Sequence, residues 1–197
     1  MQNNKNIHCL ILAGGKARRF DGLDKGLIKV NKIRLIDHAI NNIQPQVSDI
    51  IISANRNLQE YEKLGFPVLT DNNDNFDGPL AGILRALEHI NDGVLAVIPC
   101  DMPVINKDLI SRLFQQLSVT QADICCVNDQ TGLQPLLAIM HQRVLHSLQE
   151  YLQAGHHKVM DWVTQQNLAT LDTDNTSSLL NINDMNDIKL FEASNHD

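Results

Sequence analysis

The sequence has few aromatic residues and lacks several familiar phosphate- and metal-binding motifs. Phe, Trp and Tyr make up only 4% of its 197 residues, so aliphatic side chains have to fill the core. Neither the Walker pattern GxxxxGK[ST] nor the dinucleotide fingerprint GxGxxG occurs. No CxxC pair is present, and the adjacent Cys125 and Cys126 suit neither a simple disulfide nor a zinc knuckle. We therefore expect free thiols in a reducing compartment.

Charge and hydropathy also exclude some classes of partner. The formal net charge is -7, and no basic stripe of the kind that binds nucleic acid is visible. The apolar run at residues 9–12 is far too short for the core of a signal peptide or for a membrane span. We expect a cytoplasmic protein that binds neither nucleic acid nor membrane. A hydrophobic fraction of 43% over 197 residues suits one domain covering residues 1–197.

Short aliphatic runs alternate with amphipathic helical patterns along the chain. Because buried parallel strands are rich in Val, Ile and Leu, this alternation predicts a Rossmann-like three-layer α/β/α sandwich with a mostly parallel sheet. The expected strands are residues 7–12, 49–53, 68–70, 94–98, 124–127 and 136–140. The expected helices are residues 35–44, 58–64, 80–90, 108–117, 144–153, 159–165 and 186–192.

Ligands of such sheets bind at the carboxyl ends of the strands, and a glycine pair follows the first strand. Gly14 and Gly15 let the backbone approach a ligand closely and point N–H groups toward an anion. Cationic side chains gather nearby in an otherwise acidic protein: Lys16, Arg18, Arg19 and Lys25. This combination predicts a local polyanion site.

The chain resembles the NTP-transferase family, and more narrowly the molybdenum cofactor guanylyltransferases (the MobA family). The resemblance starts with Leu12-Ala13-Gly14-Gly15, Arg19 and Asp24-Lys25-Gly26-Leu27, and it covers nearly the whole chain. Further matching segments follow in order at residues 53–56, 78–82, 99–103, 150–155 and 181–183. Each motif is weak by itself, but their order and spacing are specific.

The resemblance implies transfer of GMP from GTP to the phosphate of Mo-molybdopterin, with release of pyrophosphate. The N-terminal half would bind GTP and the C-terminal half the molybdopterin. The implied nucleotide-binding residues are Leu12, Ala13, Gly14, Gly15, Lys25, Ser53, Asn55, Asp71, Gly78 and Asp101.

Three of the residues carried over from the family have a catalytic role in this interpretation. Lys25 and Arg19 would neutralise phosphate charge, including the charge that develops on pyrophosphate. Asp101 follows a purely aliphatic strand and would bind Mg²⁺, a hard cation that keeps waters and phosphate oxygens as its other ligands. Cys100 beside it is expected to pack in the core.

The acceptor side is expected near Asn181 and Asn183. Loop and helix-capping roles are equally open for these residues, since Asn183 or Asp184 could cap the last helix. The chain also departs from the family in this half. It has Gln134-Pro135 where the family usually has a His-Pro pair, and His156-His157-Lys158 where a Glu-Arg-Arg segment is usual. A turn at His156 and His157 that touches the molybdopterin is one interpretation of the second change.

Other functions remain open from the sequence. The protein could be a molybdopterin cytidylyltransferase or a sugar-phosphate nucleotidyltransferase, and nucleotide competition would separate these. A non-catalytic nucleotide- or cofactor-binding protein would release no pyrophosphate. We expect a monomer, and docking with molybdenum cofactor synthesis or chaperone proteins follows from the resemblance alone.

Overall fold

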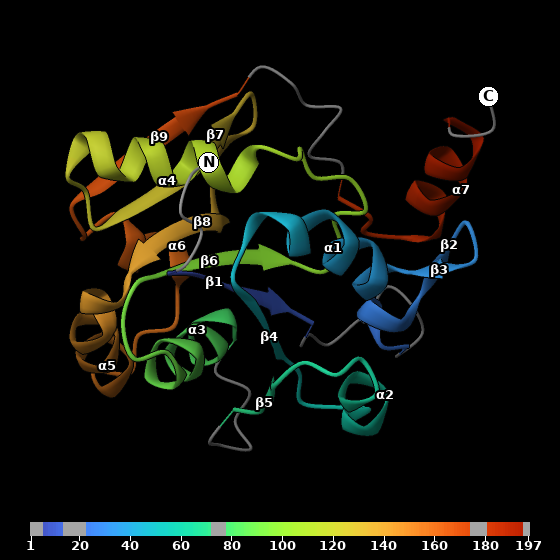
Figure 1. Cartoon of the computed structure of the whole chain (residues 1–197), viewed down its shortest axis with the longest axis horizontal. Helices are drawn as coiled ribbons and strands as arrows, with labels where there is room; N and C mark the ends of the chain where they lie inside the picture. Colours follow the sequence, from blue (N-terminus) through green and yellow to red (C-terminus); the bar gives the residue numbers. More distant parts are fainter. Residues whose placement is uncertain (1–5, 14–22, 72–77, 174–180, 195–197) are drawn as a thin grey trace.

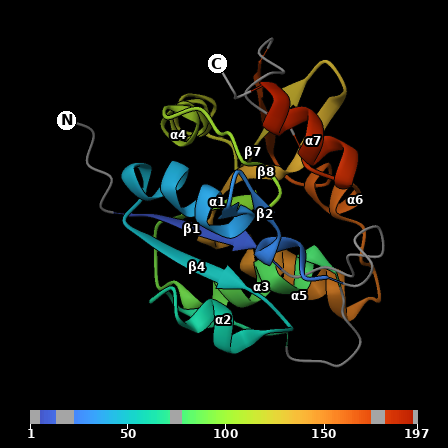
Figure 2. The same ribbon diagram turned by 90° about the vertical axis from the view of Figure 1, so that its right-hand side faces the viewer.

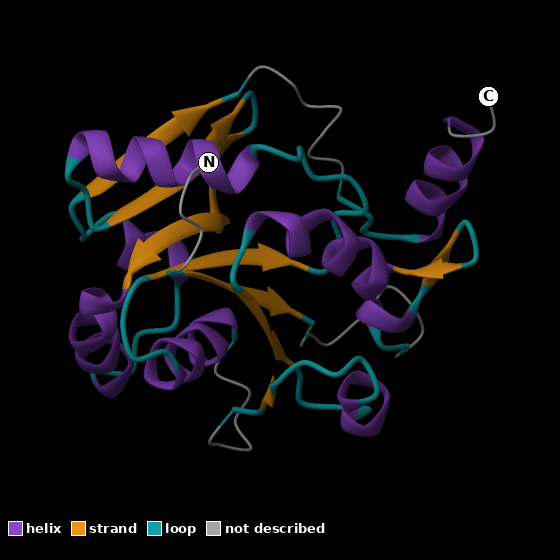
Figure 3. Ribbon diagram, in the orientation of Figure 1, coloured by secondary structure: helices purple, strands orange, loops and turns teal. Residues whose placement is uncertain are grey.

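The protein forms a seven-stranded mixed sheet covered by helices on both faces (Figures 1 and 3). A computed structural model describes residues 6–13, 23–71, 78–173 and 181–194. The sheet has the order β5-β4-β1-β6-β8-β7-β9, and a two-stranded hairpin, β2-β3, lies outside it. The sheet strands are β1 (Ile7–Leu12), β4 (Asp49–Ser53), β5 (Val68–Leu69), β6 (Val94–Pro99), β7 (Ile124–Asp129), β8 (Gly132–His141) and β9 (Leu168–Asp172).

All pairings in the sheet are parallel except those of β8, which runs antiparallel to β6 and β7. The prediction of a mostly parallel sheet is thus confirmed. The helices are α1 (Leu35–Ile43), α2 (Leu58–Glu62), α3 (Pro79–His89), α4 (Leu109–Thr120), α5 (Leu145–Gln153), α6 (Val159–Val163) and α7 (Met185–Ser194). No helix within the described ranges is long and apolar enough to cross a membrane.

Alternation along the buried strands produces two aliphatic cores, one on each face of the sheet. In β1, Cys9 and Ile11 pack with α1, α2 and α4, whereas Leu10 and Leu12 pack with α3, α5 and α6. Side chains of successive strand residues point to opposite faces, so a strand buried on both sides must be apolar throughout. The predicted three layers follow from this pattern (Figure 2).

Two parts of the fold were not expected from the sequence. The hairpin of β2 (Lys29–Val30) and β3 (Ile33–Arg34) turns at Asn31 and Lys32, which both have positive φ. Lysine rarely adopts that conformation, so the turn carries no recognisable signal. Edge strand β9 was also missed.

Helix α7 packs beside this hairpin, so a helix near the end of the chain lies against residues 29–34 (Figure 1). A third, small core joins the two, made of Val30, Leu35, Ile182, Ile188 and Phe191. Asn31 also donates its backbone N–H to the Glu192 carboxylate at 2.9 Å. This packing fixes the segment before α7, which carries Asn181 and Asn183, relative to the N-terminal half.

Candidate active site

The carboxyl ends of β1, β4 and β6 lie in register at one edge of the sheet. Leu12 is paired with Ser53 on one side and with Pro99 on the other. Polar residues that follow these strands therefore come together, although they are far apart in the sequence. This is the edge at which parallel sheets bind ligands.

Lys25 lies at the start of a 3₁₀ turn, η2 (Lys25–Leu27), which is held by Asp24. Oδ1 of Asp24 accepts the Gly26 N–H at 3.2 Å and the Tyr61 hydroxyl at 2.5 Å. A Cβ on Gly26 would come within 2.5 Å of the Tyr61 oxygen, so only glycine fits. Burial and the bond to Asp24 raise the pKa of Tyr61, which keeps the hydroxyl a neutral donor. The turn is therefore fixed from within the core.

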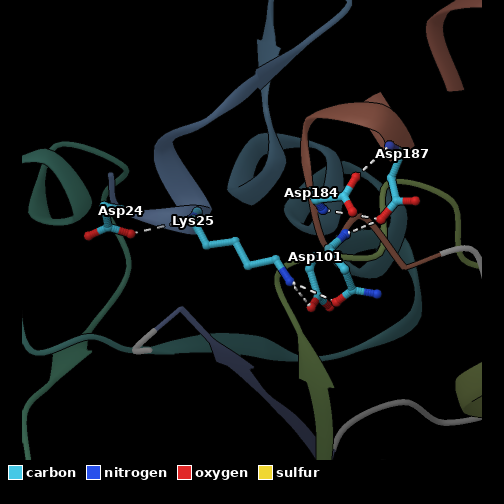
Figure 4. A network of polar contacts seen from close by, with 7 residues as sticks. Asp24, Lys25, Asp101, Asp184 and Asp187 are labelled. Atoms are coloured by element: carbon cyan, nitrogen blue, oxygen red, sulfur yellow. Dashed lines mark hydrogen bonds and ion pairs between the residues drawn. The ribbon is translucent and has the colours of Figure 1, made fainter. Parts of the chain in front are cut away.

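The Lys25 side chain reaches across the sheet edge to two residues of other segments (Figure 4). Its Nζ donates to Oδ2 of Asp101 at 2.6 Å and to Oδ1 of Asn183 at 3.3 Å. Side-chain exposures of 21% for Lys25 and 18% for Asp101 make this a mostly shielded ion pair. The three residues thus form one polar cluster of a predicted phosphate ligand, a predicted metal ligand and a predicted acceptor ligand.

Asp101 is placed by backbone contacts on both sides of it. The preceding Cys100 donates its N–H to the Leu12 carbonyl at 3.1 Å, and the Asp101 carbonyl accepts the Ile182 N–H at 2.8 Å. The Cys100 side chain is buried in the core, as expected, and burial raises the pKa of its thiol. A thiol held in its protonated form is a poor nucleophile, so the chemistry of this turn belongs to Asp101.

The structure separates two roles that the sequence left open, capping of the last helix and a side-chain contact at the site. Asp184 caps α7, since its Oδ1 accepts the N–H groups of Asn186 at 2.8 Å and Asp187 at 3.1 Å. Asp187 reaches back and accepts the N–H groups of Asn183 and Asp184, which completes a reciprocal cap (Figure 4). The Asn183 side chain is thereby left to contact Lys25.

A second polar pair lies at the ends of β4 and β5. Nδ2 of Asn55 donates to Oδ2 of Asp71 at 2.7 Å, and the Asp71 N–H donates to Oδ1 of Asn55 at 2.9 Å. This two-point contact fixes the Asp71 carboxylate. Since a carboxylate can accept from both N1–H and the 2-amino group of guanine, the pair suits the base or ribose of a nucleotide.

Other residues that were predicted to bind the nucleotide also make contacts that stabilise the fold. The Ala13 N–H donates to the Ser53 carbonyl at 2.9 Å, and the Leu12 carbonyl accepts from Cys100, so these groups serve the sheet. The Ser53 side chain is only 4% exposed and packs against α3. Gly78 caps α3 with φ +75° and is exposed. Gly14, Gly15 and Arg19 lie outside the described residues.

A pocket of about 480 Å³ opens beside Asp101, on the β8 side of β6. Asn181 lines it, as do Met102 and three polar residues of the β7–β8 hairpin that the sequence did not single out as ligands: Asp129, Thr131 and Gln134. His156 and His157 are not among the lining residues, and the ring of His156 instead contacts Tyr151 at a centroid distance of 5.1 Å. Pro135 and the leucines after it give the pocket an apolar wall.

The donor set at Asp101 fits a magnesium ion. Oδ1 of Asp101 is buried and has no hydrogen-bond donor within the part of the chain that the structure describes. No cluster of three or more His, Cys, Asp or Glu side chains suited to a metal occurs there either. A single carboxylate is nonetheless sufficient for Mg²⁺, which usually retains waters and takes substrate phosphates as ligands.

With a lysine ammonium and an aspartate carboxylate paired at the carboxyl edge of its sheet, the protein is an α/β nucleotidyltransferase by fold and by family. The chain belongs to the MobA-like NTP transferase domain family, which it matches over residues 9–170. It is 37% identical over 178 residues to a molybdenum cofactor guanylyltransferase of Shewanella piezotolerans, covering 90% of this chain and 87% of that one. A relative with the same name from Shewanella putrefaciens is 37% identical over 187 residues, covering 94% and 96%.

The fold has counterparts among solved structures. The molybdopterin-guanine dinucleotide biosynthesis protein A from Archaeoglobus fulgidus superposes with a TM-score of 0.78 at 23% identity, covering 95% of this chain and 97% of that one. The predicted fold class and the resemblance to this family are both confirmed.

Proposed function

We propose that the protein transfers GMP from GTP to the terminal phosphate of Mo-molybdopterin, which yields molybdopterin guanine dinucleotide and pyrophosphate. The cluster of Lys25, Asp101 and Asn183 beside the pocket carries this proposal. It joins a cation for the leaving phosphates, a carboxylate for a metal ion and an amide on the acceptor side. Membership of the family and the printed names of its relatives support the same reaction.

The two substrates would approach Asp101 from opposite sides. Asn55 and Asp71 lie at the β4–β5 end of the sheet and would hold the guanosine. The pocket lies on the β8 side and would hold the molybdopterin, with Asn181 in its lining and Asn183 against Lys25. The N-terminal half would in this way bind the donor and the C-terminal half the acceptor.

In the proposed reaction an acceptor phosphate oxygen forms a bond to the α-phosphorus of GTP as the bond to the β-phosphate oxygen breaks. The attacking phosphate is anionic near neutral pH, so the site needs no strong base. Lys25 would neutralise the charge that develops on the departing pyrophosphate, with Arg19 as a second cation. Asn183 would fix the position of the Lys25 ammonium, and Asp101 would hold Mg²⁺. That ion, when bound, supplies charge neutralisation at the phosphate oxygens.

The redox state of the cysteines bears on the cellular compartment in which the reaction would occur. All four cysteines are free and buried, which is compatible with a reducing cytoplasm. We further propose a monomer that receives or delivers its cofactor through other proteins of the same synthesis.

Nucleotide selectivity tests the proposal before any acceptor is prepared. GTP, CTP, ATP and UTP would be titrated into the protein with and without Mg²⁺ and followed by calorimetry. We expect GTP to bind most tightly and its affinity to rise with Mg²⁺. Preference for CTP would identify a cytidylyltransferase instead, and a folded sample that binds none of the four would refute the proposal.

A further inference from the structure

The β7–β8 hairpin carries a polar arrangement that the reaction described so far does not use. Nε2 of Gln134 donates to Oδ1 of Asp129 at 3.2 Å and to Oγ1 of Thr131 at 2.8 Å. Oδ1 of Asp129 also accepts from the backbone N–H of Thr131 at 2.8 Å and its hydroxyl at 2.6 Å. All three residues line the pocket beside Asp101.

These contacts fix which way the Gln134 amide faces. A carboxylate only accepts hydrogen bonds, so the amide nitrogen has to face Asp129. Partial burial opposes ionisation of Asp129, but the bonds from Thr131 and Gln134 prevail and lower its pKa, which keeps it a carboxylate. The amide oxygen, Oε1, faces away from Asp129. Among residues 6–13, 23–71, 78–173 and 181–194 no group donates to it.

The pocket therefore combines an oriented acceptor with an apolar wall. Gln134 is followed in β8 by Pro135, Leu136 and Leu137, which line the same pocket. Aliphatic walls of this kind accommodate the faces of a planar ring, and a single fixed polar group then selects its edge. The matching edge is one that donates hydrogen bonds.

We propose that Oε1 of Gln134 accepts a hydrogen bond from the 2-amino-4-oxopyrimidine edge of the acceptor's pterin ring and so determines acceptor specificity. Asp129 acts as a positioning residue through Gln134. This inference rests on the proposed function, because that function supplies a pterin as the acceptor. The same edge chemistry occurs in guanine, but Asn55 and Asp71 lie on the other side of Asp101, so Gln134 faces the acceptor rather than GTP.

Two fluorescent ring probes test the inference without the reaction. Pterin carries the 2-amino group, and lumazine has an oxygen at that position. We expect the wild-type protein to bind pterin about tenfold more tightly, since one hydrogen bond contributes about that factor. Gln134→Met keeps the length of the side chain but removes the acceptor, and it should bind the two probes equally. Gln115→Met, on the exposed face of α4, should retain the preference.

Three further measurements separate the alternatives. Asp129→Asn should weaken pterin binding and leave lumazine binding unchanged, whereas a purely structural defect would weaken both. Gln134→Met should raise the KM for molybdopterin about tenfold with the KM for GTP unchanged. A Gln134→Met protein that prefers GTP less over ITP, which lacks the 2-amino group, would assign the residue to guanine and overturn the proposal.

The role of Gln134 and the proposed function can fail separately, because ring binding and turnover are measured in different experiments. Pyrophosphate release from GTP and molybdopterin without any pterin preference would reject the role of Gln134 and leave the function standing. A Gln134-dependent pterin preference in a protein without turnover would support the pterin subsite and reject the function. Wild-type protein that binds neither probe would overturn the inference.

Discussion

Nζ of Lys25 lies 2.6 Å from Oδ2 of Asp101, although 76 positions separate the two residues in the sequence. The proposed reaction gives each of them a different partner, phosphate for the ammonium and a metal ion for the carboxylate. In the structure each charge is satisfied by the other, and we expect the substrate complex to exchange this ion pair for contacts to phosphate and metal.

Replacing Lys25 should remove a cation for the phosphates and also free the Asp101 carboxylate for a metal ion. Lys25→Met removes the charge with little change in length, and we expect kcat to fall roughly 100- to 1000-fold because charge on the leaving pyrophosphate loses its cation. Without the competing ammonium, Asp101 should bind Mn²⁺ more tightly in the absence of nucleotide, as measured by electron paramagnetic resonance. Lys63→Met serves as the control, since Lys63 is 66% exposed and pairs with Glu60, three positions earlier in the chain. Equal kcat in both variants would rule out the role of Lys25.

The amide of Asn183 should matter for activity and the carboxylate of Asp187 for stability. Asn183→Ala removes a contact to Lys25 but leaves the cap of α7 intact, so we expect a three- to tenfold loss of kcat and an unchanged free energy of unfolding. Asp187→Ala removes half of the reciprocal cap and should cost about 1 kcal/mol of that free energy. Urea denaturation and steady-state kinetics on both variants distinguish the roles. A reversed pattern would show that Asn183 is the structural residue.

Gly82 of α3 and Ser53 of β4 should be energetically coupled. A Cβ on Gly82 would lie 2.5 Å from the Ser53 hydroxyl oxygen, so Gly82→Ala should lower the free energy of unfolding by about 1–3 kcal/mol despite the better helix propensity of alanine. In a Ser53→Ala background the same change should cost less, because the closest atom is absent and only Cβ of residue 53 at 3.1 Å and Cδ2 of Leu12 at 3.2 Å remain close. A double-mutant cycle in urea measures this coupling. Additive effects would show that the two residues do not meet.

Alkaline pH should destabilise the fold through its buried thiols. Burial raises the pKa of Cys126 to about 12, against about 8.5 for a thiol in the unfolded chain. Below about pH 8.5 the thiol is protonated in both the folded and the unfolded state, so its full contribution to stability is present. As the pH rises further only the unfolded thiol ionises, and the free energy of unfolding decreases. This one group should cost about 2 kcal/mol at pH 10. The free energy of unfolding of Cys126→Ala should fall less steeply with pH than that of the wild type, and parallel curves would argue against the shift.

The layers and strand ends followed from the sequence because they depend on local patterns. Aliphatic runs such as Ile7–Leu12 and Val94–Pro99 have few alternatives to buried strands, and ligand sites follow their carboxyl ends. Lys25 and Asp101 could be named from motifs that resemble a family. Their mutual ion pair could not, because it depends on where η2, held by Asp24 and Tyr61, lies relative to the end of β6.

The pocket beside Asp101 could not be predicted from local sequence patterns. Asp129, Thr131 and Gln134 lie in a short hairpin, and their polar pattern resembles that of an ordinary turn. They become a wall of the site only because β8 runs antiparallel between β6 and β7, which brings its first residues next to Asp101. The departure from the family's His-Pro pair at Gln134 was the one local signal in that segment.

Transfer of label from GTP tests the central claim most directly. GTP labelled at the α-phosphorus would be incubated with molybdopterin, Mg²⁺ and either the wild-type protein or Asp101→Asn, and product and pyrophosphate would be quantified. We expect label in the molybdopterin product with an equal amount of pyrophosphate, and a loss of at least about 100-fold in Asp101→Asn with its fold retained. Folded wild-type protein that releases no pyrophosphate from GTP, or an Asp101→Asn variant with normal turnover, would contradict the central claim.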